Sequence, residues 1–109
     1  MLRVSRYSVV VLLAIFLFSG IAMAETKWQK HHPRRVQVNK RLHNENKRIN
    51  KKVKQGKMSP AEAKKLKKDI RKIRKEERAM TKPRGGHITA AEHKALNQQE
   101  NAVSREIDK

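Results

Sequence analysis

The chain has 109 residues, no cysteine and a formal net charge of +18, from 28 Lys and Arg against 10 Asp and Glu. The lack of cysteine excludes disulfide bonds and a cysteine nucleophile. Aromatic residues make up only 4% of the chain, so any core is small, and the excess of positive charge points to an anionic partner.

The first 24 residues have the three parts of a secretory signal peptide. Arg3 and Arg6 form a positive n-region, and the apolar run at 9–18 is too short to span a bilayer as a helix. Residues 22–24, Ala-Met-Ala, fit the small-residue cleavage signal. We therefore expect secretion with cleavage after Ala24; the alternative is a retained membrane anchor.

Residues 25–33 show no apolar periodicity, and we expect a mobile N-terminal arm there. The arm carries Trp28 and the pair His31-His32. The histidine pair is either a metal ligand set or part of a solvated arm whose tryptophan docks on a surface. No set of His and Cys in the chain has the spacing of metal ligands, so we assign no metal site.

One pattern, G-x-[MI]-[ST]-x-A-E-x-K-x-L, occurs twice, at 56–66 and at 86–96. Repetition at a fixed offset indicates a repeated structural unit. The spacing of Gly and Glu also matches the second half of an EF-hand loop. The positions that would form the first half hold Lys, Val and Gln in one copy and Thr, Pro and Gly in the other. Calcium needs oxygen ligands there, so we exclude it.

Each copy of the pattern predicts the start of a helix. Ser59 and Thr89 are N-cap residues, and Glu62 and Glu92 three positions later complete two capping boxes. Pro60 fits the first helical position.

Beyond the arm, apolar residues recur at helical spacing in three segments, and we expect helices at about 34–55, 60–80 and 90–107. No segment alternates like a half-buried strand. The fold class is therefore all-α: a helical repeat domain over 34–109, built as a hairpin or a thin bundle with a marginal core, within one chain or as a dimer. The apolar stripes are Val38, Leu42, Ile49 and Val53, then Ala63, Leu66, Ile70 and Ile73, then Leu96, Val103 and Ile107.

Charge is unevenly distributed along the chain. Residues 25–80 hold 21 basic and 6 acidic side chains, whereas residues 81–109 hold 5 and 4. The second helix places like charges at i,i+3 and i,i+4, which destabilises it by a few tenths of a kcal/mol per pair. A polyanion along the helix would relieve this repulsion; the alternative is a solvated face that keeps the protein soluble. The expected anion-binding residues are Lys47, Arg48, Lys51, Lys52, Lys64, Lys67, Lys68, Arg71, Lys72 and Lys75.

No residue set suggests catalysis. The chain has no Gly-rich phosphate loop, and Ser104 has no neighbouring histidine in the sequence to act as its base. Glu76 and Glu77 are adjacent and point apart on a helix, so they do not form an acid–base pair. We expect a protein that is not an enzyme, has no small-molecule substrate and needs no cofactor.

The two helix starts resemble the LTxxQ signature of the Spy/CpxP family of periplasmic chaperones. The matching segments are 58–62, Met-Ser-Pro-Ala-Glu, and 88–92, Ile-Thr-Ala-Ala-Glu, with Glu in place of Gln in both. That resemblance implies an all-helical, secreted and often dimeric protein. It also implies that unfolded client proteins bind on a basic, partly apolar surface.

Residues 33–107 are also similar to small, basic, uncharacterised bacterial periplasmic proteins with G-x-[LIM]-[ST]-x-x-E repeats. The similarity is carried by 32–35, His-Pro-Arg-Arg, by 85–89, Gly-Gly-His-Ile-Thr, and by 96–104, Leu-Asn-Gln-Gln-Glu-Asn-Ala-Val-Ser. It implies a bacterial source and a periplasmic location, and it implies no activity.

Three functions are compatible with these features. The leading hypothesis is a non-enzymatic periplasmic binding protein that engages lipopolysaccharide, anionic lipid or acidic protein segments, with an affinity that falls steeply with salt. The first alternative is a small stress chaperone of the Spy/CpxP kind. The second is nucleic-acid binding, which the charge permits. The expected secretion and the single aromatic residue beyond position 24 argue against that second alternative.

Overall fold

Three long helices follow one another in the computed structural model, which describes residues 25–109; the expected signal peptide lies outside these residues. They are α3 (Pro33–Lys54), α4 (Pro60–Thr81) and α5 (Ala90–Asp108). A short helix, α2 (Lys27–His31), precedes them, and a 3-10 turn, η1 (Lys82–Arg84), follows α4. The described residues contain no strand, which confirms the all-α class and the three expected helices to within a residue or two at each end.

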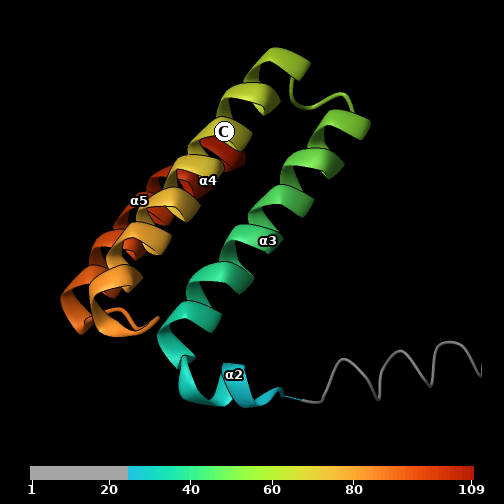
Figure 1. Cartoon of the computed structure of the whole chain (residues 1–109). Coiled ribbons are helices and arrows are strands. Elements are labelled where there is room, and N and C mark those ends of the chain that lie inside the picture. Colours follow the sequence, from blue (N-terminus) through green and yellow to red (C-terminus); the bar gives the residue numbers. More distant parts are fainter. Residues whose placement is uncertain (1–24) are drawn as a thin grey trace, which may run out of the picture. The chain divides into compact units, whose positions relative to one another are not determined.

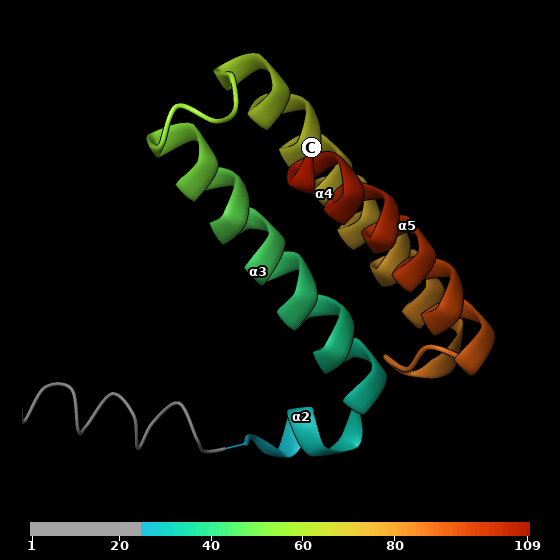
Figure 2. The same ribbon diagram turned by 180° about the vertical axis from the view of Figure 1, so that it is seen from behind.

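The three long helices form a bundle in which consecutive helices are antiparallel and α3 and α5 run in the same direction (Figures 1 and 2). Each helix contacts the other two. Among the described residues, every buried apolar side chain lies between positions 38 and 107, and these residues form the core of the described bundle. No helix in the described part of the chain is long and apolar enough to cross a bilayer.

The N-terminal arm contains one element of regular structure, the short helix α2. The Thr26 backbone N–H donates to Oε1 of Gln29 (2.8 Å), and the Gln29 backbone N–H donates to Oγ1 of Thr26 (3.1 Å). This reciprocal pair is a capping box, and its T-x-x-Q spacing is visible in the sequence. The mobility of the arm stays a prediction.

The repeated pattern does place two helix starts. The backbone N–H of Glu62 donates to Oγ of Ser59 (3.1 Å), and that of Glu92 donates to Oγ1 of Thr89 (3.1 Å). At Thr89 the reciprocal bond is also present, since the Thr89 N–H donates to Oε1 of Glu92 (2.9 Å). This bond, followed by the Arg84 side chain, lowers the pKa of Glu92. Of the two expected capping boxes, only the one at Thr89 and Glu92 is complete, because the Glu62 side chain accepts no bond from Ser59.

Glycines end α3 and the 3-10 turn η1 that follows α4. Gly56 has φ +70°, and the Lys57 N–H donates to the carbonyl of Lys52 (2.8 Å), which closes a Schellman motif after α3. After α4, Gly85 has φ +60° and the Gly86 N–H donates to the carbonyl of Thr81 (3.0 Å). Only glycine adopts these left-handed conformations without strain.

The expected apolar stripes form the core, and two further residues join them. Met58 and Ile88, the apolar residues of the repeat just before each N-cap, are 7% and 3% exposed, so they belong to the core. Val53 is partly buried and packs against it. The other buried apolar residues are Val38, Leu42, Ile49, Ala63, Leu66, Ile70, Ile73, Leu96, Val103 and Ile107.

Three glutamates that the stripes omitted are also buried, one on each long helix. Glu45, Glu77 and Glu100 are 1%, 1% and 0% exposed. Glu45 lies three residues after Leu42, and Glu100 lies four residues after Leu96. They occupy inward positions of the helical repeat, where an apolar residue is usual.

Candidate anion-binding face

One side of α4 carries basic residues along its whole length. Buried positions recur at 63, 66, 70, 73 and 77, so the cations fall on the opposite side of the helix. Most of these side chains are exposed, and those of Lys67 and Arg74 are half-buried. We call this set the basic face: Lys64, Lys67, Lys68, Arg71, Lys72, Arg74, Lys75 and Arg78.

A surface depression of about 550 Å³ lies on the basic face. Its lining is entirely cationic and consists of Lys68, Arg71, Lys72, Arg74, Lys75 and Arg78. Lys and Arg offer charge-assisted hydrogen bonds to phosphate and carboxylate oxygens, so the chemistry of this surface is that of anion binding.

None of the four acids of α4 lines this depression. Asp69 pairs with Lys65 (3.5 Å), and Glu76 accepts a hydrogen bond from Gln99 of α5 (2.6 Å). Glu77 is buried. Acids of α4 therefore lie only at the edges of the basic face: Asp69 and Glu76 line a depression with Lys72, and Glu77 lines one with Arg74 and Arg78.

A second depression, of about 390 Å³, lies between α3 and α4 at the end of the basic face. Val53, Pro60 and Ala63 supply its apolar part. Its polar lining consists of Asn50, Lys54, Lys64, Lys67 and Arg71, and the ammonium group of Lys67 donates to Oδ1 of Asn50. An apolar surface next to cations suits a ligand that has both an anionic group and an apolar segment.

None of the four expected anion-binding residues of α3 lines either depression. Lys47 and Lys51 are exposed, whereas Arg48 and Lys52 are half-buried and contact α5. Arg48 pairs with Asp108, and Lys52 donates to the carbonyl oxygen of Ile107. These two cations connect helices, which a count of charges in the sequence does not reveal.

The sequence analysis missed three cations of the surface: Lys54, Arg74 and Arg78. A signal for them was present. Arg78 continues the spacing Lys64, Lys68, Arg71, Lys75 along one side of an α-helix. Arg74 lies at the edge of that side, and Lys54, at the end of α3, joins the surface only through the packing of α3 against α4.

No family model, curated protein or solved structure matches the chain. The functional interpretation therefore depends on the geometry of the surface.

A second polar cluster lies where the loop after α4 meets the start of α3. Arg34 donates to the carbonyl of Ile88 (3.0 Å), and Arg35 donates to that of Gly86 (3.2 Å). The rings of His32 and His87 are stacked, with centroids 4.4 Å apart. These contacts bring together two segments, 32–35 and 85–89, that are distant in the sequence, and they hold the loop in place.

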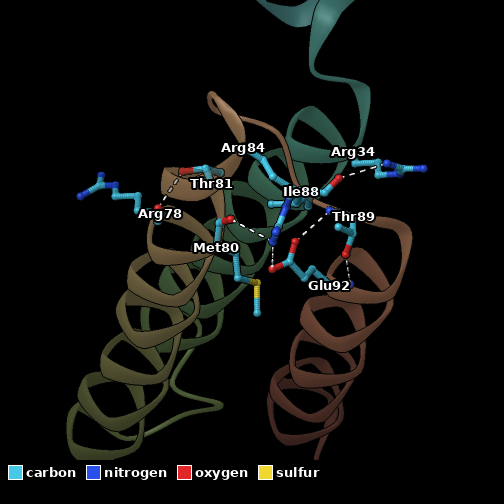
Figure 3. A network of polar contacts seen from close by, with 8 residues as sticks. All are labelled: Arg34, Arg78, Met80, Thr81, Arg84, Ile88, Thr89 and Glu92. Atoms are coloured by element: carbon cyan, nitrogen blue, oxygen red, sulfur yellow. Dashed lines mark hydrogen bonds and ion pairs between the residues drawn. The ribbon is translucent and has the colours of Figure 1, made fainter.

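The same loop is fixed on its other side by Arg84 (Figure 3). Its guanidinium group donates to the carbonyl of Met80 (3.3 Å) and pairs with Glu92. Within residues 25–109, no group of three or more His, Asp or Glu side chains is placed to hold a metal ion. We interpret the polar contacts at this end of the bundle as structural, because they hold the loop between α4 and α5 in place.

Proposed function

We propose that the protein is a non-enzymatic, secreted binding protein of the periplasm that engages anionic partners through the basic face of α4. Candidate partners are lipopolysaccharide, anionic lipid head groups and acidic protein segments. The observation that supports this most strongly is the depression on α4 that is lined by six cations and by no acid.

The energetics of α4 favour such a partner. Cations three and four residues apart repel one another on an exposed helix surface, and water and salt screen this repulsion only in part. A row of phosphates or carboxylates along the face would replace repulsion with attraction. Each Lys or Arg near an anionic bilayer contributes about 1 kcal/mol to binding.

The test is a charge reversal on the basic face, with binding to vesicles measured by co-sedimentation. The variant Lys68→Glu/Arg71→Glu/Lys75→Glu is compared with a matched control, Lys82→Glu/Lys94→Glu/Arg105→Glu. Both change the net charge equally, and all six side chains are exposed. Vesicles contain phosphatidylglycerol or lipopolysaccharide, with neutral phosphatidylcholine vesicles as a blank.

We expect the basic-face variant to lose about 100-fold in affinity, because at least three cations are removed from contact at about 1 kcal/mol each. The control variant should lose far less, and wild-type binding should weaken with salt. Equal losses in the two variants would show that only net charge matters and would contradict the assignment of the face.

A second candidate function, a small periplasmic chaperone, is favoured by the depression between α3 and α4. There Val53, Pro60 and Ala63 lie beside cations, a mixture that suits partly apolar unfolded segments. This function predicts suppression of client aggregation at physiological salt. Binding that is purely electrostatic predicts vesicle binding without such suppression.

A further inference from the structure

The three buried glutamates have few partners for their oxygens. Oε2 of Glu45 accepts a hydrogen bond from Oγ of Ser104 (2.6 Å) on α5, and Oε1 of Glu77 accepts one from Arg35 (2.8 Å) and one from Asn39 (3.1 Å) on α3. The other oxygen of each is buried without a hydrogen bond, and so are both oxygens of Glu100. An ionised carboxylate in such a place is strongly disfavoured.

The cost of ionisation is greatest for Glu100, because its charged neighbours on both other helices include carboxylates. From α3 it faces Glu45 and Arg41, and from α4 it faces Glu77. Arg41 is the one cation acting on it among the described residues, and its guanidinium group is hydrogen-bonded to Asn97 (3.3 Å to Oδ1) and Asn101 of α5.

The remaining cations near the cluster lie beside the other two glutamates, Glu77 and Glu45. Glu77 shares a surface depression with Arg35, Arg74 and Arg78, and Arg48 acts on Glu45. Three carboxylates from three helices therefore meet in one core, and the member with no hydrogen bond lies on α5.

We propose that these glutamates form a proton latch: the closed bundle is the stable form while Glu100 keeps its proton, and the bundle loosens as the pH rises. Loosening would expose the apolar stripes of three helices beside the basic face. The latch is a property of the core and does not depend on which anion the basic face binds.

The pH range follows from the titration of Glu100. Burial, and then the charge of Glu45, raises its pKa from 4.5 to about 8. Burial also raises the pKa of Glu45, against the hydrogen bond from Ser104. A raised pKa in the folded state gives stability that is fully present below pH 4.5. That stability is lost as the pH rises to about 8, because the Glu100 carboxyl releases its proton at a lower pH in the unfolded chain than in the folded one.

The experiment is thermal unfolding of residues 25–109, followed by far-UV circular dichroism at pH 5.0, 6.5 and 8.0 and constant ionic strength. The Tm of the wild type should fall by about 10 °C or more across this range. In Glu100→Gln, which cannot ionise, most of that fall should disappear, and the variant should be the more stable protein at pH 8.0.

Glu106→Gln is the matched control, since it makes the same change on the exposed side of the same helix. It should show the full wild-type fall. If Glu100→Gln is poorly folded, the Glu100→Leu variant takes its place in the test. An apolar side chain of similar size should raise the Tm above that of the wild type at pH 8.0. A wild-type Tm that is equal at pH 5.0 and 8.0 would overturn the latch. So would a full fall in Glu100→Gln, or a Leu variant that does not fold.

Discussion

Arg35 and Arg48 each pair with a carboxylate of another helix, but they do so in different environments. The side chains of Arg35 and Glu77 are 17% and 2% exposed, whereas those of Arg48 and Asp108 are 41% and 66% exposed. Removing Arg35 would leave the buried carboxyl group of Glu77 with Asn39 as its one hydrogen-bond donor among the described residues. Removing Arg48 would leave a carboxylate that water can solvate.

We therefore expect Arg35→Ala to reduce the free energy of unfolding by about 3–5 kcal/mol. Arg48→Ala should reduce it by less than about 1 kcal/mol. Urea unfolding at neutral pH, with the same m-value in both variants, measures the difference. Similar small losses in the two variants would show that the buried pair is not a determinant of the fold.

The core residues hardest to predict from the sequence are those whose type conflicts with their position. Glu45, Glu77 and Glu100 lie at inward positions of their helices, but a charged residue there suggests a surface position. Counting the period alone, without regard to residue type, would have placed them in the core. Their hydrogen-bond partners follow only from how the three helices pack.

At the scale of the helices, the ends were predictable because each is set by local chemistry. Ser59 and Thr89 cap the starts of α4 and α5, as the repeated pattern predicts, and Pro33 begins α3, one residue before the expected start. The same reasoning, applied to Thr26 and Gln29, would have found α2. The side of each helix that carries the basic residues was also partly predictable, since it lies opposite the apolar stripe.

The two copies of the repeat allow a controlled test of a helix cap. The hydrogen bond from the Thr89 N–H lowers the pKa of Glu92, so the ionised form stabilises α5. This stability is present above pH 4.5 and is lost as the pH falls through the lowered pKa. Glu62 accepts no hydrogen bond from Ser59 in the described structure.

We expect Glu92→Gln to lower the Tm at pH 7, and we expect the difference from wild type to shrink at pH 3, because the stability from the ionised Glu92 is lost as the pH falls. Glu62→Gln is the control and should cost less at pH 7, because its cap has one bond fewer. Thermal melts at the two pH values measure both. A loss for Glu92→Gln that is as large at pH 3 as at pH 7 would exclude the charge of Glu92 as its cause.

At the scale of the whole molecule, three helices of the described chain bury a narrow apolar core under a strongly positive surface. Residues 25–109 carry 26 basic and 10 acidic side chains, so repulsion acts against the folded form throughout. The proposed binding function requires that the bundle fold in spite of this charge, because the basic face exists as one surface only when α4 is a helix packed against its neighbours.

The measurement that tests this requirement most directly is a far-UV circular dichroism melt of residues 25–109 without any partner, at low and at moderate salt. The structure predicts a highly helical protein that unfolds in one cooperative transition, with a higher Tm at moderate salt because repulsion is screened. A weakly helical trace that changes gradually with temperature would contradict a preformed basic face. It would mean that the chain folds only on its anionic partner.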